Sequence, residues 1–378
     1  MTDIFISSDN ILTPIGLTTA ENFWQLKQNA SGIKMHDDIN MSEQPFYGAL
    51  FDNENFFSNT NPQNNYTKFE KLLIASVSDA LANSAIDATG KNTILIISST
   101  KGNISLLETE TVSQSLHTRI SLNNSAKLVA DHFTFVNQPI VISNACISGM
   151  LAILTGMRLI QSGQYEHAVV AGADVISKFV LSGFQSFQAI SPSPCKPFDA
   201  ARDGINLGEG AGTMILTSNK AHSSGVKVTG GSVSNDANHI SGPSRTGEEL
   251  NIAISKAMKA AVLKPSDIDL ISAHGTATIY NDEMEAKAIT LAGMQSVPVN
   301  SLKGYYGHTL GAAGLIESII SIQSLKENLV IPTRGFEHMG VTQAVNICSS
   351  LHATTLQNCL KTASGFGGCN AAMIFSKQ

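Results

Sequence analysis

Apolar residues follow two spacings along the chain, and segments of the two kinds alternate. Over residues 66–84 the apolar positions recur at helical spacing, which predicts a helix with one buried face. Residues 93–97 form an unbroken apolar and β-branched run, typical of a strand buried on both faces. The alternation indicates a layered α/β protein. It predicts further helices over 146–161, 248–262, 282–292 and 312–326 and near 125–132, a glycine-led turn into a strand over 204–217, and strands over 139–143, 167–173, 268–273 and 297–301 and near Val345 and Ala371.

The pattern divides near residue 218. An N-terminal half over residues 1–217 and a C-terminal half over residues 218–378 each carry strands interleaved with helices. Polar residues dominate 53–65, which predicts a surface loop, and they also dominate 101–137. With 378 residues, of which 43% are apolar and 14% charged, the chain can bury a large core and has no signature of disorder.

Charge and cysteine usage narrow the function. The net charge is −6 and lysine and arginine do not cluster, so the sequence gives no support for nucleic-acid binding. No apolar stretch approaches the roughly 18 residues of a membrane span, and the first residues, MTDIFISSDN, lack the apolar segment of a signal peptide. The five cysteines form no CxxC pair, which argues against a disulfide framework and a zinc site. We therefore expect a protein of the reducing cytoplasm.

Cys146 is the first candidate for chemistry. It follows a predicted strand and stands at the start of a predicted apolar helix, in the segment PIVISNACISGM. Helix N-termini present free N–H groups and the positive end of the dipole, which predicts a thiolate at this position. The arrangement resembles a nucleophile elbow. A lone buried cysteine is more often a packing residue, and the other four keep that interpretation: Cys195, Cys348, Cys359 and Cys369.

Two histidines stand in glycine-rich surroundings. His274 ends a predicted strand in ISAHGTATIYND, and His308 lies in a glycine-flanked turn in SLKGYYGHTLGAAG. Either one alone is weak evidence among 10 histidines. Together with Cys146 they form a Cys/His set of the kind that supports covalent acyl transfer. Metal binding is the poorer alternative, because neither histidine has a second ligand at helical spacing.

The chain closes on SGFGGCNAAMIF, a GxGG run that leads into a predicted strand. Glycine-rich backbone of this kind can aim its N–H groups into a site as oxyanion donors. A dinucleotide fingerprint is excluded, because no strand–helix unit follows the glycines.

The motifs, taken in order, resemble one family. They are LTPIGLTTAENFWQLKQNASGI, NACISG, KPFDAARDGINLGEGAG, SNDANHISGP, AHGTATIYND, KGYYGHTLGAAG and SGFGGCN, and they extend over the whole chain. They resemble those of the β-ketoacyl-acyl-carrier-protein synthases of the elongating class, in the thiolase-like superfamily. The resemblance implies an α/β fold in which two similar βαβαβαββ halves pack as five layers, αβαβα, and it implies a dimer, usually a homodimer.

The resemblance also implies roles for single residues. Cys146 would accept an acyl chain from an acyl carrier protein, and His274 and His308 would bind a malonyl thioester and support its decarboxylation. No cofactor or metal of the enzyme's own is implied, because the substrates arrive on the phosphopantetheine of the carrier. Further implied roles are an oxyanion hole from the N–H groups of Cys146 and Phe366, a supporting charge pair of Lys303 and Glu317, an aromatic gate at Phe366, and contacts to the phosphopantetheine arm from Thr276, Thr278 and Gly367.

The second histidine distinguishes the elongating class from related families. The initiating class pairs its cysteine with histidine and asparagine, and thiolases use a second cysteine, so His308 favours the elongating class. Several features depart from the family: segment 101–137 is short, the loop at 192–196 is abbreviated, Ile279 replaces a common proline, and Gln188 stands where many members have an arginine for carrier docking. These departures leave three alternatives open: a specialised polyketide or aryl-polyene synthase with a non-identical partner subunit, a non-catalytic partner resembling a chain-length factor, and a thiolase-like acyltransferase for coenzyme A esters.

Overall fold

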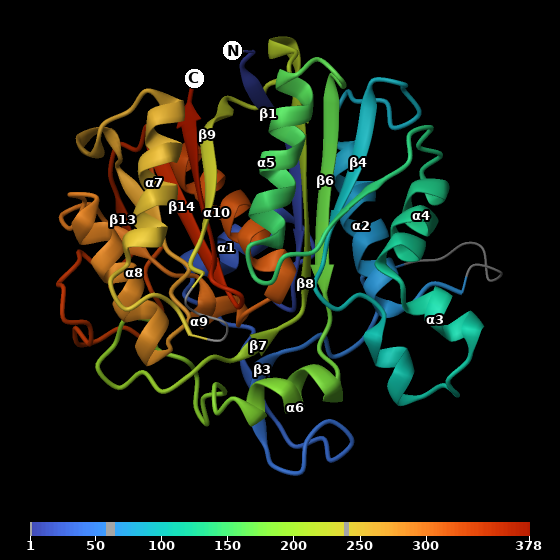
Figure 1. The fold of residues 1–378 in the computed structure, drawn as a ribbon, viewed down its shortest axis with the longest axis horizontal. Helices are drawn as coiled ribbons and strands as arrows, with labels where there is room; N and C mark the ends of the chain where they lie inside the picture. The colour runs from blue at the N-terminus through green and yellow to red at the C-terminus, as the bar shows by residue number, and fades with distance from the viewer. Residues whose placement is uncertain (1, 58–64, 238–241) are drawn as a thin grey trace.

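A ten-stranded mixed sheet organises the protein, and it consists of two half-sheets of five strands that join at one edge. The computed structural model describes residues 2–57, 65–237 and 242–378. The half-sheets meet where β1 (Ile4–Leu12) pairs antiparallel with β9 (Val226–Asn235) over Ile4–Val228 and Phe5–Lys227. Both termini lie near this junction, at the top of Figure 1.

The N-terminal half-sheet is made of β1, β8 (Gly210–Thr217), β6 (His167–Asp174), β4 (Thr93–Ser98) and β5 (Ile140–Ile142), in that order. The strands β4, β5 and β6 run parallel, whereas β8 is antiparallel to both of its neighbours. Helices α2 (Lys68–Ala82) and α4 (Leu122–His132) pack on its outer face. Apolar residues of α2, such as Leu72 and Val77, there meet Leu95 and Val169 of the strands.

The C-terminal half repeats this topology. Its strand order is β9, β15 (Cys369–Lys377), β14 (Asn358–Gly365), β10 (Leu270–Ser272) and β11 (Val299–Asn300). Here β10, β11 and β14 are parallel and β15 is antiparallel to both neighbours. Helices α7 (Glu248–Ala261) and α8 (Ile279–Leu291) contribute the apolar layer that covers the outer face.

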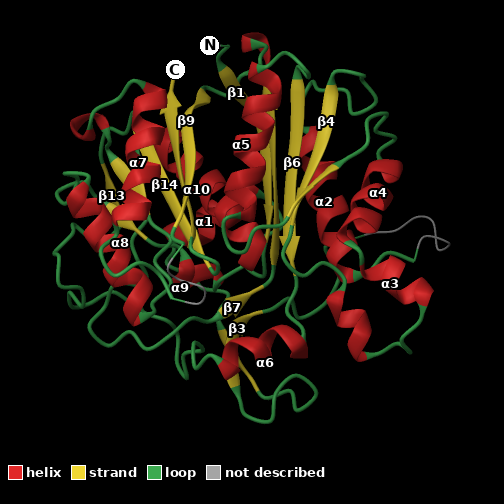
Figure 2. Ribbon diagram, viewed as in Figure 1, coloured by secondary structure: helices red, strands yellow, loops and turns green. Residues whose placement is uncertain are grey.

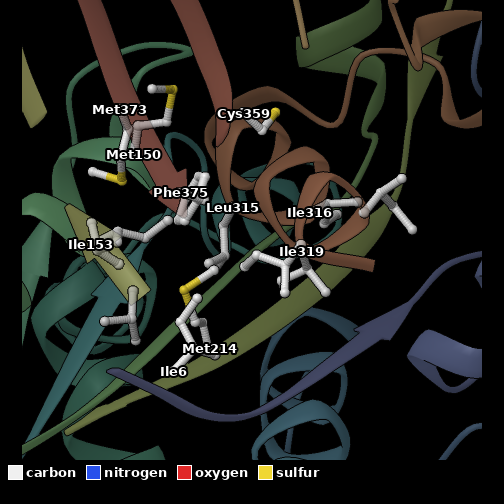
Figure 3. Close-up of a cluster of buried hydrophobic side chains, with 14 of the residues drawn as sticks. Ile6, Met150, Ile153, Met214, Leu315, Ile316, Ile319, Cys359, Met373 and Phe375 are labelled. Carbon is white, nitrogen blue, oxygen red and sulfur yellow. The ribbon is translucent and has the colours of Figure 1, made fainter. Parts of the chain in front are cut away.

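Two buried helices, α5 (Ser148–Gln161) and α10 (Ala313–Glu327), fill the space between the half-sheets and contact each other. They can approach closely because glycines face the crossing: a Cβ on Gly149 would lie 2.7 Å from the Leu315 backbone nitrogen. Figure 2 shows the resulting layers, with helices outside both half-sheets and between them. Apolar side chains from both central helices and both half-sheets meet in one core, including Met150, Leu315, Met214 and Phe375 (Figure 3). The expected five-layered fold is confirmed.

Shorter elements surround this frame, and two of them lead into the central helix α10. Helix α9 (Lys303–Tyr306) and the 3₁₀ turn η4 (Leu310–Ala312) lie just before α10. The others are α1 (Thr19–Lys27), β2 (Lys34–His36), β3 (Phe46–Ala49), η1 (Ile104–Glu108), α3 (Gln114–Ile120), α6 (Lys178–Ser186), β7 (Leu207–Gly208), η2 (Lys220–His222), η3 (Pro265–Asp267), β12 (Leu329–Val330) and β13 (His352–Ala353).

The predicted helices and the buried strands of both halves are confirmed, apart from their ends. The strand expected near Val345 is wrong: Val345 is buried in a loop that makes one isolated bridge to Val299 through Ile347. Of the loop predicted at 53–65, residues 58–64 lie outside the described residues, as do 238–241 of the SNDANHISGP motif. The division near residue 218 stays a prediction. Among the described helices, none has the length and apolar character needed to cross a membrane.

Candidate active site

Cys146 lies in a tight turn between β5 and α5. Ala145, just before it, has φ 42°, in the left-handed region that non-glycine residues rarely adopt. The Ser148 hydroxyl holds the turn closed, since it accepts from the Asn144 N–H at 2.8 Å and donates to the Ala145 carbonyl at 2.6 Å. A strained backbone held by surrounding hydrogen bonds is a common feature of reactive sites. Helix α5 begins at Ser148 with Ile147 as its N-cap, so Cys146 precedes the helix rather than opening it.

The thiol of Cys146 differs from the sequence expectation of a thiolate. Burial, together with a smaller effect of the nearby Cys369 thiol, raises its pKa to about 12 against the opposing effect of Lys303 and Lys101. Desolvation disfavours the charged form, and here it outweighs the nearby cations. The resting sulfur is therefore a protonated thiol, and its nucleophilicity depends on a neighbouring base.

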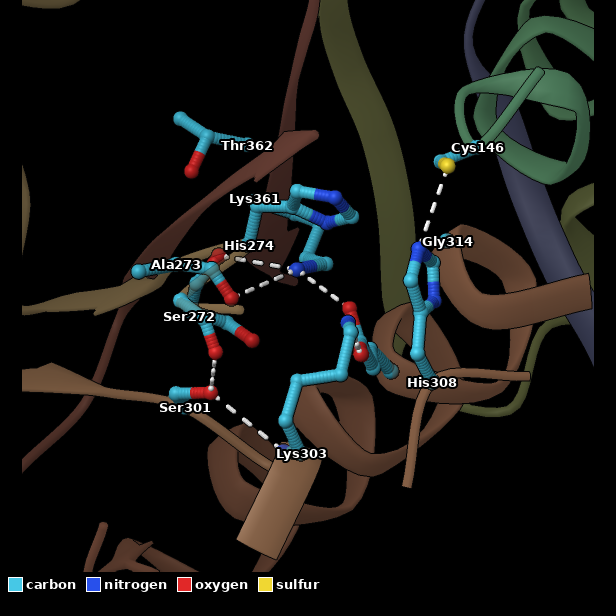
Figure 4. Close-up of polar contacts among 12 residues, drawn as sticks. Cys146, Ser272, Ala273, His274, Ser301, Lys303, His308, Gly314, Lys361 and Thr362 are labelled. Carbon is cyan, nitrogen blue, oxygen red and sulfur yellow. Dashed lines mark hydrogen bonds and ion pairs between the residues drawn. The ribbon is translucent and has the colours of Figure 1, made fainter. Parts of the chain in front are cut away.

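His308 provides that neighbour. Its Nε2 atom lies 3.1 Å from the Cys146 Sγ atom (Figure 4). The turn that carries it is fixed on both sides, because the His308 N–H donates to the Asn206 carbonyl at 2.7 Å and the His308 carbonyl accepts from the Gly208 N–H at 3.0 Å. Gly307, with φ 65°, makes the reversal possible.

His274 stands just past the end of β10, with its ring at 5.1 Å and 82° from the ring of His308. The backbone N–H groups of His274 and Gly275 donate to the two oxygens of the buried Glu285 carboxylate at 2.7 and 2.8 Å. Burial lowers the pKa of both imidazoles well below 6.5, and the Lys303 ammonium lowers both further. Both rings are neutral near pH 7.

The structure thus brings the three predicted residues together. One ligand-type atom from each of Cys146, His274 and His308 lies within 4.8 Å of the others. A thiol and two imidazoles can hold a soft divalent ion, and they can equally perform acyl transfer with a neutral base and hydrogen-bond donors. A bound metal ion would occupy the Cys146 sulfur that acyl transfer needs as its nucleophile.

Lys303 and Glu317 form an ion pair that is almost fully buried, as the sequence interpretation placed them. Sequence reasoning missed Lys361, a fully buried lysine of β14 that lies 2.7 Å from the second oxygen of Glu317. It also missed Glu285 and Asp174. Asp174 accepts from the Ser99 hydroxyl at 2.6 Å and from the Gly311 N–H at 2.7 Å, which ties the loop after β4 to the turn after His308. A charged residue within a buried strand is the one local signal that would have pointed to Lys361.

A cavity of about 380 Å³ leads to these residues and is lined by Cys146, His274 and His308. Tyr280 and Phe366 also line it and are 75% and 42% exposed, so the cavity reaches the surface. Its lining is mostly apolar. The hydroxyls of Thr276 and Thr278 are exceptions; both line the cavity and bond to each other at 2.9 Å.

The glycine-rich tail passes directly beside the nucleophile. A Cβ on Gly365 would lie 2.9 Å from the backbone nitrogen of Cys146, so only glycine leaves room there. The ring of Phe366 stacks on Phe184 at 5.9 Å and meets Phe187 edge-on at 5.5 Å, at the mouth of the cavity. Gly367 is exposed and does not line the cavity, so its contact to the substrate stays a prediction.

Comparison with known proteins identifies the family. Residues 1–222 match the family described as the N-terminal domain of β-ketoacyl synthase, and residues 226–337 match the C-terminal domain. The chain belongs to the β-ketoacyl synthase family. It is therefore a condensing acyltransferase of thiolase-like fold, as the motifs implied.

Similar β-ketoacyl synthases are known by sequence and by structure. The chain is 29% identical to the 3-oxoacyl-[acyl-carrier-protein] synthase 2 of Vibrio cholerae over 99% of both chains. A β-ketoacyl synthase from Burkholderia phymatum has the same fold, with a TM-score of 0.91, 23% identity and full coverage of both chains. A ketosynthase (ApeO) in complex with its chain length factor (ApeC) from Xenorhabdus doucetiae superposes with a TM-score of 0.88 at 24% identity, over 100% of this chain and 98% of that one.

Proposed function

We propose that this β-ketoacyl synthase extends an acyl chain carried on Cys146 by two carbons taken from malonyl-acyl-carrier-protein. The observation that carries the proposal is the convergence of Cys146, His274 and His308 on a cavity that reaches the surface. The V. cholerae relative, named for an acyl carrier protein, supports the carrier as the source of both substrates.

The first step moves the acyl chain to the enzyme. As the sulfur of Cys146 attacks the carrier thioester carbonyl, its proton passes to Nε2 of His308, 3.1 Å away. The N–H groups of Cys146 and Phe366 stabilise the tetrahedral oxyanion. The bond between the carbonyl carbon and the carrier sulfur then breaks, and the carrier thiol leaves with the proton from His308.

The second step forms the carbon–carbon bond. The malonyl thioester loses its carboxylate as carbon dioxide, and the electron pair of the broken bond becomes an enolate. In this step both neutral imidazoles carry their proton on Nε2 and donate hydrogen bonds from it to the enolate oxygen. His308 accepts the thiol proton at Nε2 in the first step as its Nδ1–H tautomer, so it changes tautomer between the two steps. The carbanion attacks the acyl-Cys146 carbonyl, the carbon–sulfur bond breaks, and the β-ketoacyl chain leaves on the carrier while the Cys146 thiolate takes a proton from water. The threonine pair Thr276 and Thr278 would hold the phosphopantetheine arm, and Lys303 and Glu317 would support the His308 turn. The reaction needs no cofactor of the enzyme's own.

The partners and the cellular place belong to the same proposal. Besides the carrier protein, a second subunit is expected, either another copy or a non-identical ketosynthase-like chain. The ketosynthase–chain length factor neighbour supports the second arrangement, as does the short segment 101–137. All five cysteines are unpaired, which supports a reducing compartment such as the cytoplasm.

Acylation of Cys146 tests the proposal. The purified protein is incubated with a mixture of acyl carrier thioesters and, separately, with the matching coenzyme A esters, and its mass is measured. We expect one acyl adduct from the carrier thioesters, its loss in Cys146→Ala, and its retention in Cys348→Ala, a buried cysteine outside the cavity. An acyl adduct on the Cys146→Ala variant would show that Cys146 is not the nucleophile. Faster acylation by coenzyme A esters than by carrier thioesters would favour the alternative of a coenzyme A acyltransferase.

Adding a second subunit distinguishes a self-sufficient synthase from a chain that needs a partner. A self-sufficient synthase acylates when purified alone, and its molecular mass in solution then gives the number of copies. An obligately partnered chain acquires the adduct only when a ketosynthase-like partner is present.

A further inference from the structure

Lys361 is a buried charge that the mechanism above does not use. It lies within β14, has a relative exposure of 0%, and its Nζ atom points toward the end of β10 that carries His274 rather than toward solvent. Its Nζ atom donates to the carbonyls of Ser272 at 3.1 Å and Ala273 at 3.0 Å, and it lies 2.7 Å from Oε2 of Glu317 (Figure 4).

Charge pairing alone does not explain this lysine. The same Glu317 carboxylate already forms an ion pair with the buried Lys303 through its other oxygen. A single buried carboxylate thus lies between two buried ammonium groups. Burying an ammonium is costly, and replacing such groups by apolar side chains is often tolerated or favourable, so stability does not account for the second lysine.

The two carbonyl contacts point to a positioning role. Ser272 and Ala273 immediately precede His274, and their carbonyls are held by Lys361. The next two N–H groups, of His274 and Gly275, are held by the oxygens of Glu285. A cation on the carbonyl side and a carboxylate on the amide side therefore fix four consecutive residues at the end of β10. This segment carries His274 and sets where its ring stands relative to His308.

We infer that Lys361 is a positioning residue for decarboxylation, which holds His274 at its place beside His308 and Cys146 and thereby sets the rate of malonyl decarboxylation. The inference rests on the proposed function. Its strongest feature is that Lys361 touches the His274 segment and the Glu317–Lys303 pair at once, so that it connects the supports of both histidines.

The experiment compares two steps in Lys361→Met, which keeps the length of the side chain and removes the charge. Lys256→Met, an exposed lysine of α7, is the matched control. Acylation of Cys146 is followed by mass, and decarboxylation of malonyl carrier is followed by release of carbon dioxide. Because small displacements in a catalytic array cost about 10²-fold, we expect decarboxylation kcat to fall about 10²-fold while acylation and the KM for malonyl carrier change little. Methylammonium in the buffer should restore part of the lost kcat.

A second variant, Lys361→Gln, keeps a side-chain N–H donor, removes the charge and leaves the Lys303–Glu317 pair in place. If Lys361 positions His274 through the two carbonyls, Lys361→Gln decarboxylates faster than Lys361→Met. Should Lys361→Met fail to fold, Lys361→Gln is compared with the unmodified protein. If both variants fold and are equally slow, the carbonyl contacts do not matter and the inference is overturned. It is also overturned if both steps fall in parallel, or if Lys361→Met decarboxylates at the rate of the unmodified protein. Failure of the unmodified protein to acylate Cys146, both alone and with a ketosynthase-like partner present, would instead refute the proposed function.

Discussion

The Nε2 atom of His308 lies 3.1 Å from the Cys146 sulfur, although the two residues are 162 positions apart in the chain. Cys146 belongs to the N-terminal half and His308 to the C-terminal half, so the contact exists only when the halves are packed together. Asp174 reinforces it, because its carboxylate in the N-terminal half accepts from the Gly311 N–H, three residues after His308. The chemistry thus depends on the packing of α5 against α10.

The two histidines should fail at different steps. His308 contacts the thiol, whereas His274 packs edge-on against the His308 ring and has its own support in Glu285. We expect His308→Ala to slow acylation of Cys146 by about 10²–10⁴-fold, the usual effect of removing a general base. His274→Ala should acylate nearly normally and lose decarboxylation.

Rapid-quench acylation and carbon dioxide release measure the two steps. His352→Ala, an exposed histidine of β13, serves as the control. Acylation of His308→Ala at the rate of the unmodified protein would show that the thiol proton leaves by another route.

The pH dependence of decarboxylation follows from the buried imidazoles. Burial lowers the pKa of His274 and of His308 well below 6.5, so their protonated forms accumulate only in more acidic solution. Lys303, Lys361, Glu317, Glu285 and the Cys146 thiol are the other titratable groups around them. We expect kcat for decarboxylation to stay level from pH 8 down to about pH 6, because both imidazoles stay neutral over this range. A decline with its midpoint near 6.5 would contradict the lowered pKa values.

The strands that are hardest to predict from the sequence are those with only one apolar face and those that carry polar residues in the core. The strands β4 and β6 stood out in the sequence because their central residues form unbroken apolar runs. The strand β9 escaped prediction because its buried and half-buried positions alternate and it contains Gly230 and Gly231. The strand β14 escaped for a different reason: it is almost wholly buried, yet it contains Lys361, Thr362 and Ser364, which no hydrophobic pattern would place in a core.

The site residues that the sequence predicts also differ from those that it misses in how much their local sequence reveals. Cys146, His274 and His308 sit at the ends of elements, in glycine-rich segments whose local sequence is informative. Lys361 and Asp174 act through contacts to backbone groups that are remote in sequence: Lys361 contacts Ser272, 89 residues away, and Asp174 contacts Gly311, 137 residues away. Glu285 lies only 11 residues from His274 but acts in the same way, through the His274 backbone N–H. The Asp174 contact joins the two halves, whereas the other two form within the C-terminal half, and no local pattern encodes any of them.

The threonine pair gives a test of the phosphopantetheine contacts. Both hydroxyls line the cavity, but Thr278 also caps helix α8, where its side chain accepts from the Asn281 N–H. Thr278→Val would therefore cost about 1 kcal/mol of stability in addition to any contact with substrate. Thr276→Val is the cleaner change, and we expect it to raise the KM for malonyl carrier by about 2–10-fold, the equivalent of one hydrogen bond. Steady-state kinetics measure this, and an unchanged KM would remove Thr276 from the binding site.

The crossing of the two central helices should be as sensitive as the catalytic residues. A methyl group on Gly149 would lie 2.7 Å from the Leu315 nitrogen and 3.1 Å from the Gly311 carbonyl, and both are backbone atoms that cannot turn aside. Gly149→Ala should therefore push α5 away from α10, lower the free energy of unfolding by about 1–3 kcal/mol, and slow acylation, because Cys146 is three residues away. Gly183→Ala is the matched control in helix α6, where an added methyl meets nothing within 4 Å. That change should raise the free energy of unfolding by about 0.5–1 kcal/mol, since alanine favours a helix over glycine. Denaturant unfolding and acylation rates measure both effects, and a Gly149→Ala protein as stable and as active as the unmodified one would mean that the helices can separate at the crossing without disturbing the site.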